Sequence, residues 1–272
     1  MKPLLRFFAR ILPLRRLRAP AVFLARLVRG IAPGLEADAF VSALGYPELG
    51  PSVRIENHVA LKRSRVSLVT TAGFFVKGDL AFREGPLYGD FTFRVIPRDM
   101  PPARLALGKA FLDRRLPLLD PNIVFPIERL KELKAEKVIQ EAALYHYSLA
   151  AYCGDTDPLV GGSAKEIARR MRYEGVDKAV ILPASRLGQE AAVRVQRVIE
   201  EAGIPTVSVL YSKAAAEALK PPRCVILENR PLARSEEYLD RETQKELLLK
   251  LLRKFEPFGE TSPHGEPAAL KR

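Results

Sequence analysis

The sequence contains few of the side chains that most often carry metal, redox or disulfide chemistry. Its 272 residues include two cysteines, three histidines and no tryptophan. Cys153 and Cys224 lie far apart, with neither a Cys-x-x-Cys pair nor a cluster of cysteine and histidine. This scarcity excludes a disulfide framework and argues against a structural zinc site. It is typical of proteins in a reducing compartment, so we expect the chain to be cytoplasmic.

Nucleotide-binding motifs are also missing. The sequence has no P-loop and no Gly-x-Gly-x-x-Gly phrase, the glycine-rich loops that bring backbone amides close to phosphates. The residues therefore predict no dinucleotide, and we expect neither another cofactor nor a metal.

Acidic residues are absent from the amino-terminal arm. The net charge of the chain is +12, and residues 1–35 contain eight lysines and arginines before the first acidic residue, Glu36. The rest of the chain is closer to balance, so the basic character belongs to an appendage. We place the end of this basic, amphipathic extension at residue 62.

Apolar residues recur in the arm at helical spacing, with basic residues on the opposite side and breaks at Pro13 and Pro20. The uncharged run at 19–25 is too short to cross a bilayer. One interpretation places residues 1–30 on an anionic membrane surface. The other, which we favour, packs them on the core or on a partner subunit. Nucleic acid is not an expected partner, because no recognised binding module accompanies the charge.

Short apolar runs alternate with helical patterns between residues 63 and 256. This order is typical of an α/β fold, a layered and mostly parallel sheet flanked by helices. Strands are predicted at 66–70, 91–96, 104–107, 142–147, 179–182, 206–210 and 224–227. Helices are predicted at 127–135, 163–174, 189–202 and 242–255, with Ser163 capping the second. Residues 257–272 are predicted to be a disordered tail.

Several phrases occur in an informative order. They are VSLVTTAG at 66–73, GDFTFRVIP at 89–97, DPNIVFP at 120–126, HYSL at 146–149 and, later, RVIEEAGIPTV. Together they resemble component B of the glycine, sarcosine, betaine and D-proline reductases, the selenoprotein B family. The resemblance covers about residues 63–256. It implies a protein partner subunit and reductive cleavage of the C–N bond of a small amine, such as an amino acid or betaine, with a dithiol donor.

The resemblance also shows what this chain lacks. The family attacks its substrate with a selenocysteine or cysteine, which would fall at Ser185 or Arg186, with a second cysteine near Gly188. The segment VILPASRLGQEAA at 180–192 contains no cysteine, and an unactivated serine hydroxyl does not replace a thiolate. The family's histidine-rich segment reads GKAFLDRRLPL here, and its PLG turn reads RPLAR.

Some polar residues of the family's motifs remain, and the resemblance implies that they line a substrate pocket. They are Thr70, Thr71, Gly73, Asp120, Asn122, His146 and Ser148, with Ser185 and Arg186 at the lost nucleophile. The loops at 70–77, 145–155 and 183–189 would form this pocket, because ligands of parallel sheets bind beyond the carboxyl ends of the strands.

Structural interpretations stand beside these roles. We favour Asp120 and Asn122 as caps of the helix beginning near Phe125. His146 is either a pocket acid/base or a buried core histidine. Cys153 is either a relocated nucleophile activated by His146 or, more commonly for such a thiol, inert. Cys224 opens an apolar strand and is expected to pack.

Two main hypotheses follow, and the sequence does not decide whether the chain is an enzyme. In the first, it is a divergent oxidoreductase of the amine-cleaving type that uses Cys153 or a partner's thiol. In the second, it is a non-catalytic scaffold or ligand-binding subunit that docks to a partner or membrane surface through its arm.

Overall fold

The computed structural model describes residues 45–56, 59–83, 89–108, 113–228 and 230–256. The predicted helices within residues 1–30 and the predicted tail at 257–272 lie outside these described residues.

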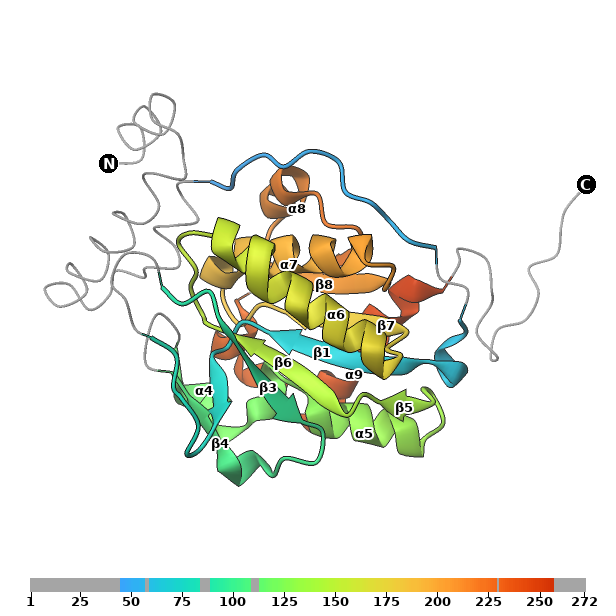
Figure 1. Ribbon diagram of the computed structural model, residues 1–272. Helices are drawn as coiled ribbons and strands as arrows, with labels where there is room; N and C mark the ends of the chain where they lie inside the picture. The colour runs from blue at the N-terminus through green and yellow to red at the C-terminus, as the bar shows by residue number, and fades with distance from the viewer. Residues whose placement is uncertain (1–44, 57–58, 84–88, 109–112, 229, 257–272) are drawn as a thin grey trace, which may run out of the picture.

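A seven-stranded sheet forms the centre of the described structure, with strand order β3–β6–β1–β7–β8–β9 (Figure 1). β5 and β6 pair with the two ends of β1 on the same side. Only β3, antiparallel to β6, breaks the parallel arrangement of the pairs described. The strands are β1 Arg65–Thr70, β3 Phe93–Pro97, β5 Glu141–Ala142, β6 Tyr145–Leu149, β7 Lys178–Leu182, β8 Thr206–Leu210 and β9 Cys224–Ile226. The predicted, mostly parallel α/β sheet is confirmed.

Helices cover both faces of the sheet (Figure 1). α6 and α7 pack on one face, and α5 and α9 pack on the other. A small antiparallel ribbon of β2 (Phe74–Val76) and β4 (Leu105–Leu107) lies beside the main sheet. The helices are α4 Arg115–Leu119, α5 Ile127–Ala135, α6 Lys165–Glu174, α7 Gln189–Glu201, α8 Lys213–Leu219 and α9 Arg241–Leu252.

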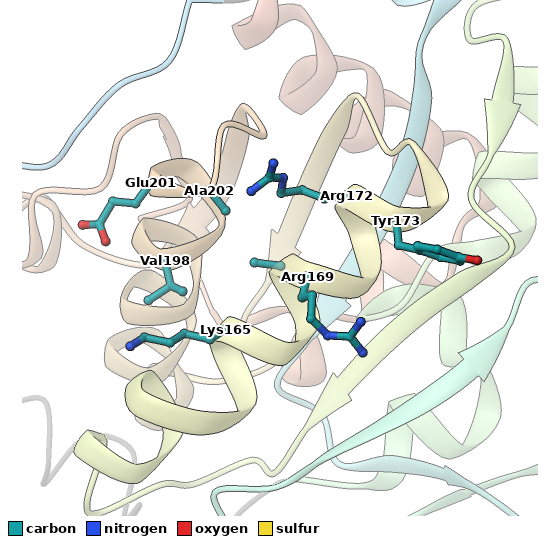
Figure 2. Close-up of a pocket in the computed structure, with 8 residues that line it drawn as sticks. Lys165, Arg169, Arg172, Tyr173, Val198, Glu201 and Ala202 are labelled. Carbon is teal, nitrogen blue, oxygen red and sulfur yellow. The ribbon is translucent and has the colours of Figure 1, made fainter.

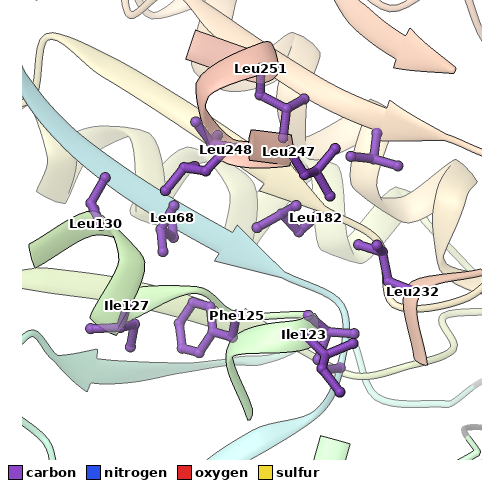
Figure 3. Packing of buried hydrophobic residues seen from close by; sticks show 14 of the residues in the cluster. Leu68, Ile123, Phe125, Ile127, Leu130, Leu182, Leu232, Leu247, Leu248 and Leu251 are labelled. Atoms are coloured by element: carbon purple, nitrogen blue, oxygen red, sulfur yellow. The ribbon is translucent and has the colours of Figure 1, made fainter. Parts of the chain in front are cut away.

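Alternate residues of the central strands enter two apolar layers. Leu68 of β1 packs with residues of α5 and α9, whereas Val69 packs with residues of α6 and α7. Figure 3 shows Leu68 near Phe125 and the leucines of α9. Because both faces are covered, β7 and β8 are buried at every position. This double burial is why parallel strands read as continuous apolar runs.

Two sequence predictions were wrong in their local detail. The strand predicted at 142–147 is divided into β5 and β6. His146 lies in β6, and its imidazole accepts a hydrogen bond from the N–H of Leu68 in β1 (3.1 Å). α6 follows a turn of π-helix, Leu159–Ala164, and Ser163 does not cap it. Instead the Ser163 hydroxyl donates to the carbonyl of Phe91 (2.7 Å). At Ser163 a tertiary contact therefore replaces the local cap that the pattern predicted.

The described part of the amino-terminal extension runs along α7 and α8 (Figure 1). The hydroxyl of Tyr46 donates to the carbonyl of Arg186 (3.2 Å). Further along, the amide of Ile55 donates to the Glu200 carboxylate (2.7 Å). Residues 45–56 are therefore held to the α/β body by buried hydrogen bonds.

A buried ion pair anchors this extension. Arg223 donates to Glu200 (2.7 Å), and their side chains are 5% and 0% exposed. Glu200 also accepts hydrogen bonds from the amide and hydroxyl of Thr206 (2.6 and 2.5 Å), and Arg223 donates to the carbonyl of Ile55. Such a pair is tolerated inside a protein because every charged oxygen has a donor.

Arg223→Ala should lower the free energy of unfolding by about 3–5 kcal/mol, because it leaves the Glu200 carboxylate buried without its counter-charge. Urea denaturation followed by circular dichroism measures this change. The control is Lys213→Ala, which breaks the exposed Lys213–Glu228 pair (3.4 Å) and should change stability little. Equal effects of the two substitutions would contradict the anchoring role.

Candidate functional site

The candidate site lies where β6, β1 and β7 end side by side. Ser148, Thr70 and Leu182 occupy neighbouring positions in the ladder, at the carboxyl edge where parallel sheets usually bind ligands. The sequence analysis chose the loops that follow these three strands, and the structure does bring them together.

Thr70 and Thr71 join the loops after β1 and β7. The Thr70 hydroxyl donates to the carbonyl of Leu182 (3.1 Å) and accepts from the amide of Ala72 (3.2 Å). The Thr71 hydroxyl accepts from the amide of Ala184 (3.3 Å). Both side chains are fully buried, so their known hydrogen bonds hold the backbone of the two loops.

The loop at the family's nucleophile position is closely packed. Ser185 is 7% exposed, and its hydroxyl makes no hydrogen bond to any described residue. The amide of Gly188 donates to the carbonyl of Ser185 (3.2 Å). A Cβ added at Gly188 would lie 2.1 Å from the Thr71 hydroxyl oxygen. The turn before α7 is therefore pressed against the end of β1.

Gln189, the first residue of α7, was not predicted as a site residue, although it is fully buried. Its amide nitrogen donates to the Tyr46 hydroxyl (2.5 Å), and its amide oxygen accepts from the Tyr211 amide (2.6 Å). The backbone carbonyl of Arg186 accepts from the same Tyr46 hydroxyl. The only sign of this role in the sequence is a polar residue within the phrase LGQEAA. The sequence could not show its partners, because Tyr46 and Tyr211 are distant from it along the chain.

His146 and Ser148 extend from β6 towards the face that α5 covers. His146 is fully buried, and its ring meets Phe125 edge-on, with centroids 6.1 Å apart. Nδ1 accepts from the Leu68 amide, which assigns the proton to Nε2. Burial, followed by the positive charges of Arg98 and Lys131, lowers the pKa of His146 to about 3. The ring is therefore neutral at physiological pH.

Two buried polar atoms on β6 lack described partners. The Nε2 atom of His146 and the hydroxyl of Ser148 make no hydrogen bond to any residue that the structure describes. Unpaired buried polar atoms are uncommon, and a water or small polar ligand often satisfies them. These two atoms could accept such a partner, and the predicted pocket role of His146 and Ser148 stays a prediction.

Asp120 and Asn122 make the hydrogen bonds of caps. The Asp120 carboxylate accepts from the amide of Asn122 (2.9 Å), and the Asn122 side chain accepts from the amide of Glu128 in α5 (3.0 Å). Asp120 also accepts from Gln244 of α9 (2.6 Å). The cavity beside Asn122, Gln244 and Leu182 has a volume of about 10 Å³, which is room for about one water and not for an amino acid.

The remaining predicted residue of the first loop, Gly73, has a φ of +82°, a left-handed conformation that favours glycine. Its carbonyl accepts from the amide of Gly108 (3.0 Å). Gly73 therefore guides the chain from β1 into the β2–β4 ribbon.

The two cysteines have the chemistry of buried thiols. The Cys153 thiol donates to the carbonyl of Asp155 (2.8 Å). Burial, followed by the negative charges of Asp155 and Asp90, raises its pKa to about 12. Burial also raises the pKa of Cys224 in β9. Neither thiol is activated by an observed contact with His146.

The described residues offer neither a metal-ion cluster nor a membrane-spanning helix. They contain no group of three or more His, Cys, Asp or Glu side chains arranged to hold a metal ion. None of their helices combines the length and the apolar composition that spanning a membrane requires.

Comparison with known proteins decides the family. D-proline reductase subunit gamma of Acetoanaerobium sticklandii is 31% identical over 195 residues, which cover 72% of this chain and 77% of that protein. The chain belongs to the proline and glycine reductase family. No protein-family model and no solved structure matches it. The resemblance carried by the sequence phrases is thereby confirmed at the level of the family.

Within this reductase-family chain, the predicted residues separate into two groups. Thr70, Thr71, Ser148 and the loop at 183–189 gather at the carboxyl edge of the sheet. Asp120 and Asn122 lie under α5 and α9, where they hold helices. The pocket role of both groups stays a prediction.

Gly188→Ala should lower the free energy of unfolding by about 1–3 kcal/mol, because the new methyl group overlaps the Thr71 side chain. Adding Thr71→Ala removes the atoms that clash, so the double variant should lose less stability than the sum of the two single variants. Chemical denaturation of all four proteins measures the coupling. Simple additivity would show that this turn is not packed against β1.

His146 should make the protein sensitive to acid. The imidazole of His146 has a pKa of 6.5 in the unfolded chain, whereas burial lowers this pKa to about 3 in the folded chain. The free energy of unfolding therefore falls as the pH falls through this window, by up to about 1.4 kcal/mol per pH unit.

The matched variant is His146→Asn, whose side-chain oxygen can still accept from the Leu68 amide. Urea denaturation between about pH 7 and pH 5 should give a shallower slope for this variant than for the natural chain. Carboxylates contribute equally to both proteins and cancel in the comparison. Equal slopes would show that His146 is protonated in the folded protein.

Proposed function

We propose that this chain is a subunit of a reductase-type assembly that binds other components without itself supplying the attacking thiolate. One observation carries the proposal. The resemblance places the family nucleophile at Ser185 or Arg186, in a packed turn in which Ser185 is buried, and the nearest replacement in the sequence, Cys153, has its pKa raised to about 12.

The chemistry of the thiol supports this role. Reductive cleavage needs a thiolate, and a thiol whose pKa lies far above neutral pH is almost wholly protonated. The Cys153 hydrogen bond to the Asp155 carbonyl also stabilises the protonated form. A serine hydroxyl is protonated too and lacks an observed base, since the only described bond of His146 goes to Leu68.

The relative supports a role within an assembly. D-proline reductase subunit gamma is, by its name, one subunit of a larger enzyme, so we infer a protein partner for this chain as well. A small amine bound at His146 and Ser148 would let the chain hold substrate for a partner's thiol. Cytoplasmic location, and contact of residues 1–30 with an anionic membrane surface, are parts of the same proposal.

The test is the pH dependence of alkylation at Cys153 and Cys224 in the folded full-length chain, read by mass spectrometry. Both thiols should react slowly at neutral pH, with Cys153 titrating well above the value of about 8.5 for a free thiol. The urea-unfolded chain supplies the rate of unprotected thiols, and Cys153→Ser isolates the signal of Cys224.

The same measurement tests the alternative, an amine-cleaving reductase with a relocated nucleophile. Rapid alkylation of Cys153 with an apparent pKa below that of a free thiol would overturn our proposal. In that case His146→Asn should slow the reaction if the histidine activates the thiol.

A further inference from the structure

A surface groove lies between α6 and α7, on the side of the sheet away from α5 and α9 (Figure 2). It has a volume of about 560 Å³. It is lined by Lys165, Ala168, Arg169, Arg172 and Tyr173 of α6, and by Val198, Glu201 and Ala202 at the end of α7.

Small side chains make the floor of the groove apolar. Ala168, Val198 and Ala202 all line the groove, and Val198 and Ala202 pack against the apolar cluster that contains Ala168. Val198 and Ala202 remain only half-buried. A partner can therefore place apolar side chains on this floor and remove the remaining surface from water.

The positive charges on the wall of the groove are only partly neutralised. Arg169 is paired with Glu166 (2.7 Å). The side chains of Lys165 and Arg172 have no ion pair or hydrogen bond with any described residue, and both extend towards α7 in Figure 2. Glu201 is the acidic residue among those that line the groove, against the three cations Lys165, Arg169 and Arg172. The net charge of the groove is therefore positive.

Tyr173 also lies at this surface and is 92% exposed, but in Figure 2 its side chain extends to the opposite side of α6 from α7. Its ring therefore lies at the edge of the surface and not over the apolar floor. Arginine is enriched at protein interfaces, so Arg172 beside this floor is consistent with a contact to a partner.

We propose that the groove between α6 and α7 docks an acidic, amphipathic helix of a partner subunit. The inference rests on the proposed function, in which the chain works inside an assembly. The partner's apolar residues would lie on Ala168, Val198 and Ala202, and its carboxylates would pair with Lys165 and Arg172. A channel between two helices fits a third helix, which presents both kinds of side chain along one edge.

The charges favour a protein helix over other polyanions. A nucleic acid strand would pair its phosphates with the cations but would bring no apolar side chains to the floor formed by Ala168, Val198 and Ala202. An anionic bilayer is flat and meets the rim of the groove but not its apolar floor.

The experiment measures peptide binding to the full-length chain by fluorescence anisotropy. The probes are three labelled synthetic peptides of roughly 16 residues, long enough to form a helix. They share one leucine-rich edge and carry glutamate, glutamine or lysine at the other positions. The glutamate peptide should bind, the glutamine peptide more weakly, and the lysine peptide not at all.

Variants then locate the binding. Lys165→Glu with Arg172→Glu should raise the Kd of the glutamate peptide at least about tenfold, since two attractive pairs become repulsive. The matched control is Lys62→Glu with Arg63→Glu, which reverses the same charge at two exposed residues outside the groove and should leave the Kd unchanged.

Several results would overturn the docking site. They are failure of the glutamate peptide to bind, equal loss in both double variants, or equal binding of the glutamine peptide. A groove variant that lost affinity for a DNA oligonucleotide or for phosphatidylserine vesicles, but not for the peptide, would assign the surface to another polyanion. None of these outcomes depends on the thiols, so the docking site and the missing nucleophile fail independently.

Discussion

The rest of the structure depends on the burial of β1. This strand pairs with β6 and β7 and sends alternate side chains into both apolar layers. Its end is fixed as firmly as its middle, because Thr70 and Thr71 continue the contact with β7 through side-chain hydrogen bonds. The loops that would receive a ligand are therefore held by the bonds that complete the sheet. At this edge the hydroxyls of Thr70 and Thr71, which a ligand would use, already make hydrogen bonds within the protein.

That burial also governs the chemistry. Removal from water disfavours the charged form of any group, so it raises the pKa of Cys153 to about 12 and lowers that of His146 to about 3. Both shifts leave the groups neutral and oppose the thiolate–imidazolium pair that an activated cysteine needs. A family member that kept its nucleophile would have to offset this desolvation with positive charge or hydrogen-bond donors at the reacting sulfur. Around Cys153 the carboxylates of Asp155 and Asp90 raise the pKa further, and the positive charge of Arg194 offsets only part of this rise.

The sequence predicted features whose causes are local. The apolar runs located the strands because doubly buried strands tolerate few polar residues. Asp120 and Asn122 were predicted to cap a helix near Phe125, because Asx side chains bond to nearby amides. Asp120 instead caps the short 3-10 helix Pro121–Ile123, and Asn122 accepts from Glu128 in the first turn of α5, which begins at Ile127. The sequence did not predict the bond from Gln244 to Asp120, which joins residues 124 positions apart. The roles of Ser163 and Gln189 were not predicted for the same reason. Each side chain bonds to a segment that is distant in the sequence and that only the tertiary structure brings near.

Polar side chains at the carboxyl edge of the sheet are used in hydrogen bonds within the protein. We therefore expect the protein to act through another surface. Several residues predicted to line a pocket, Thr70, Thr71, Asp120 and Asn122, instead make hydrogen bonds that hold loops and helices. Lys165 and Arg172 lie beside an apolar floor and make no ion pair with a described residue, although Arg172 also lies in the last turn of α6, where a positive charge stabilises the helix. Their arrangement has a physical explanation if a partner brings carboxylates to them. In a reductase-family chain with no activated thiol among its described residues, the surface between α6 and α7 is then a more informative guide to function than the sheet edge where the sequence predicts a pocket.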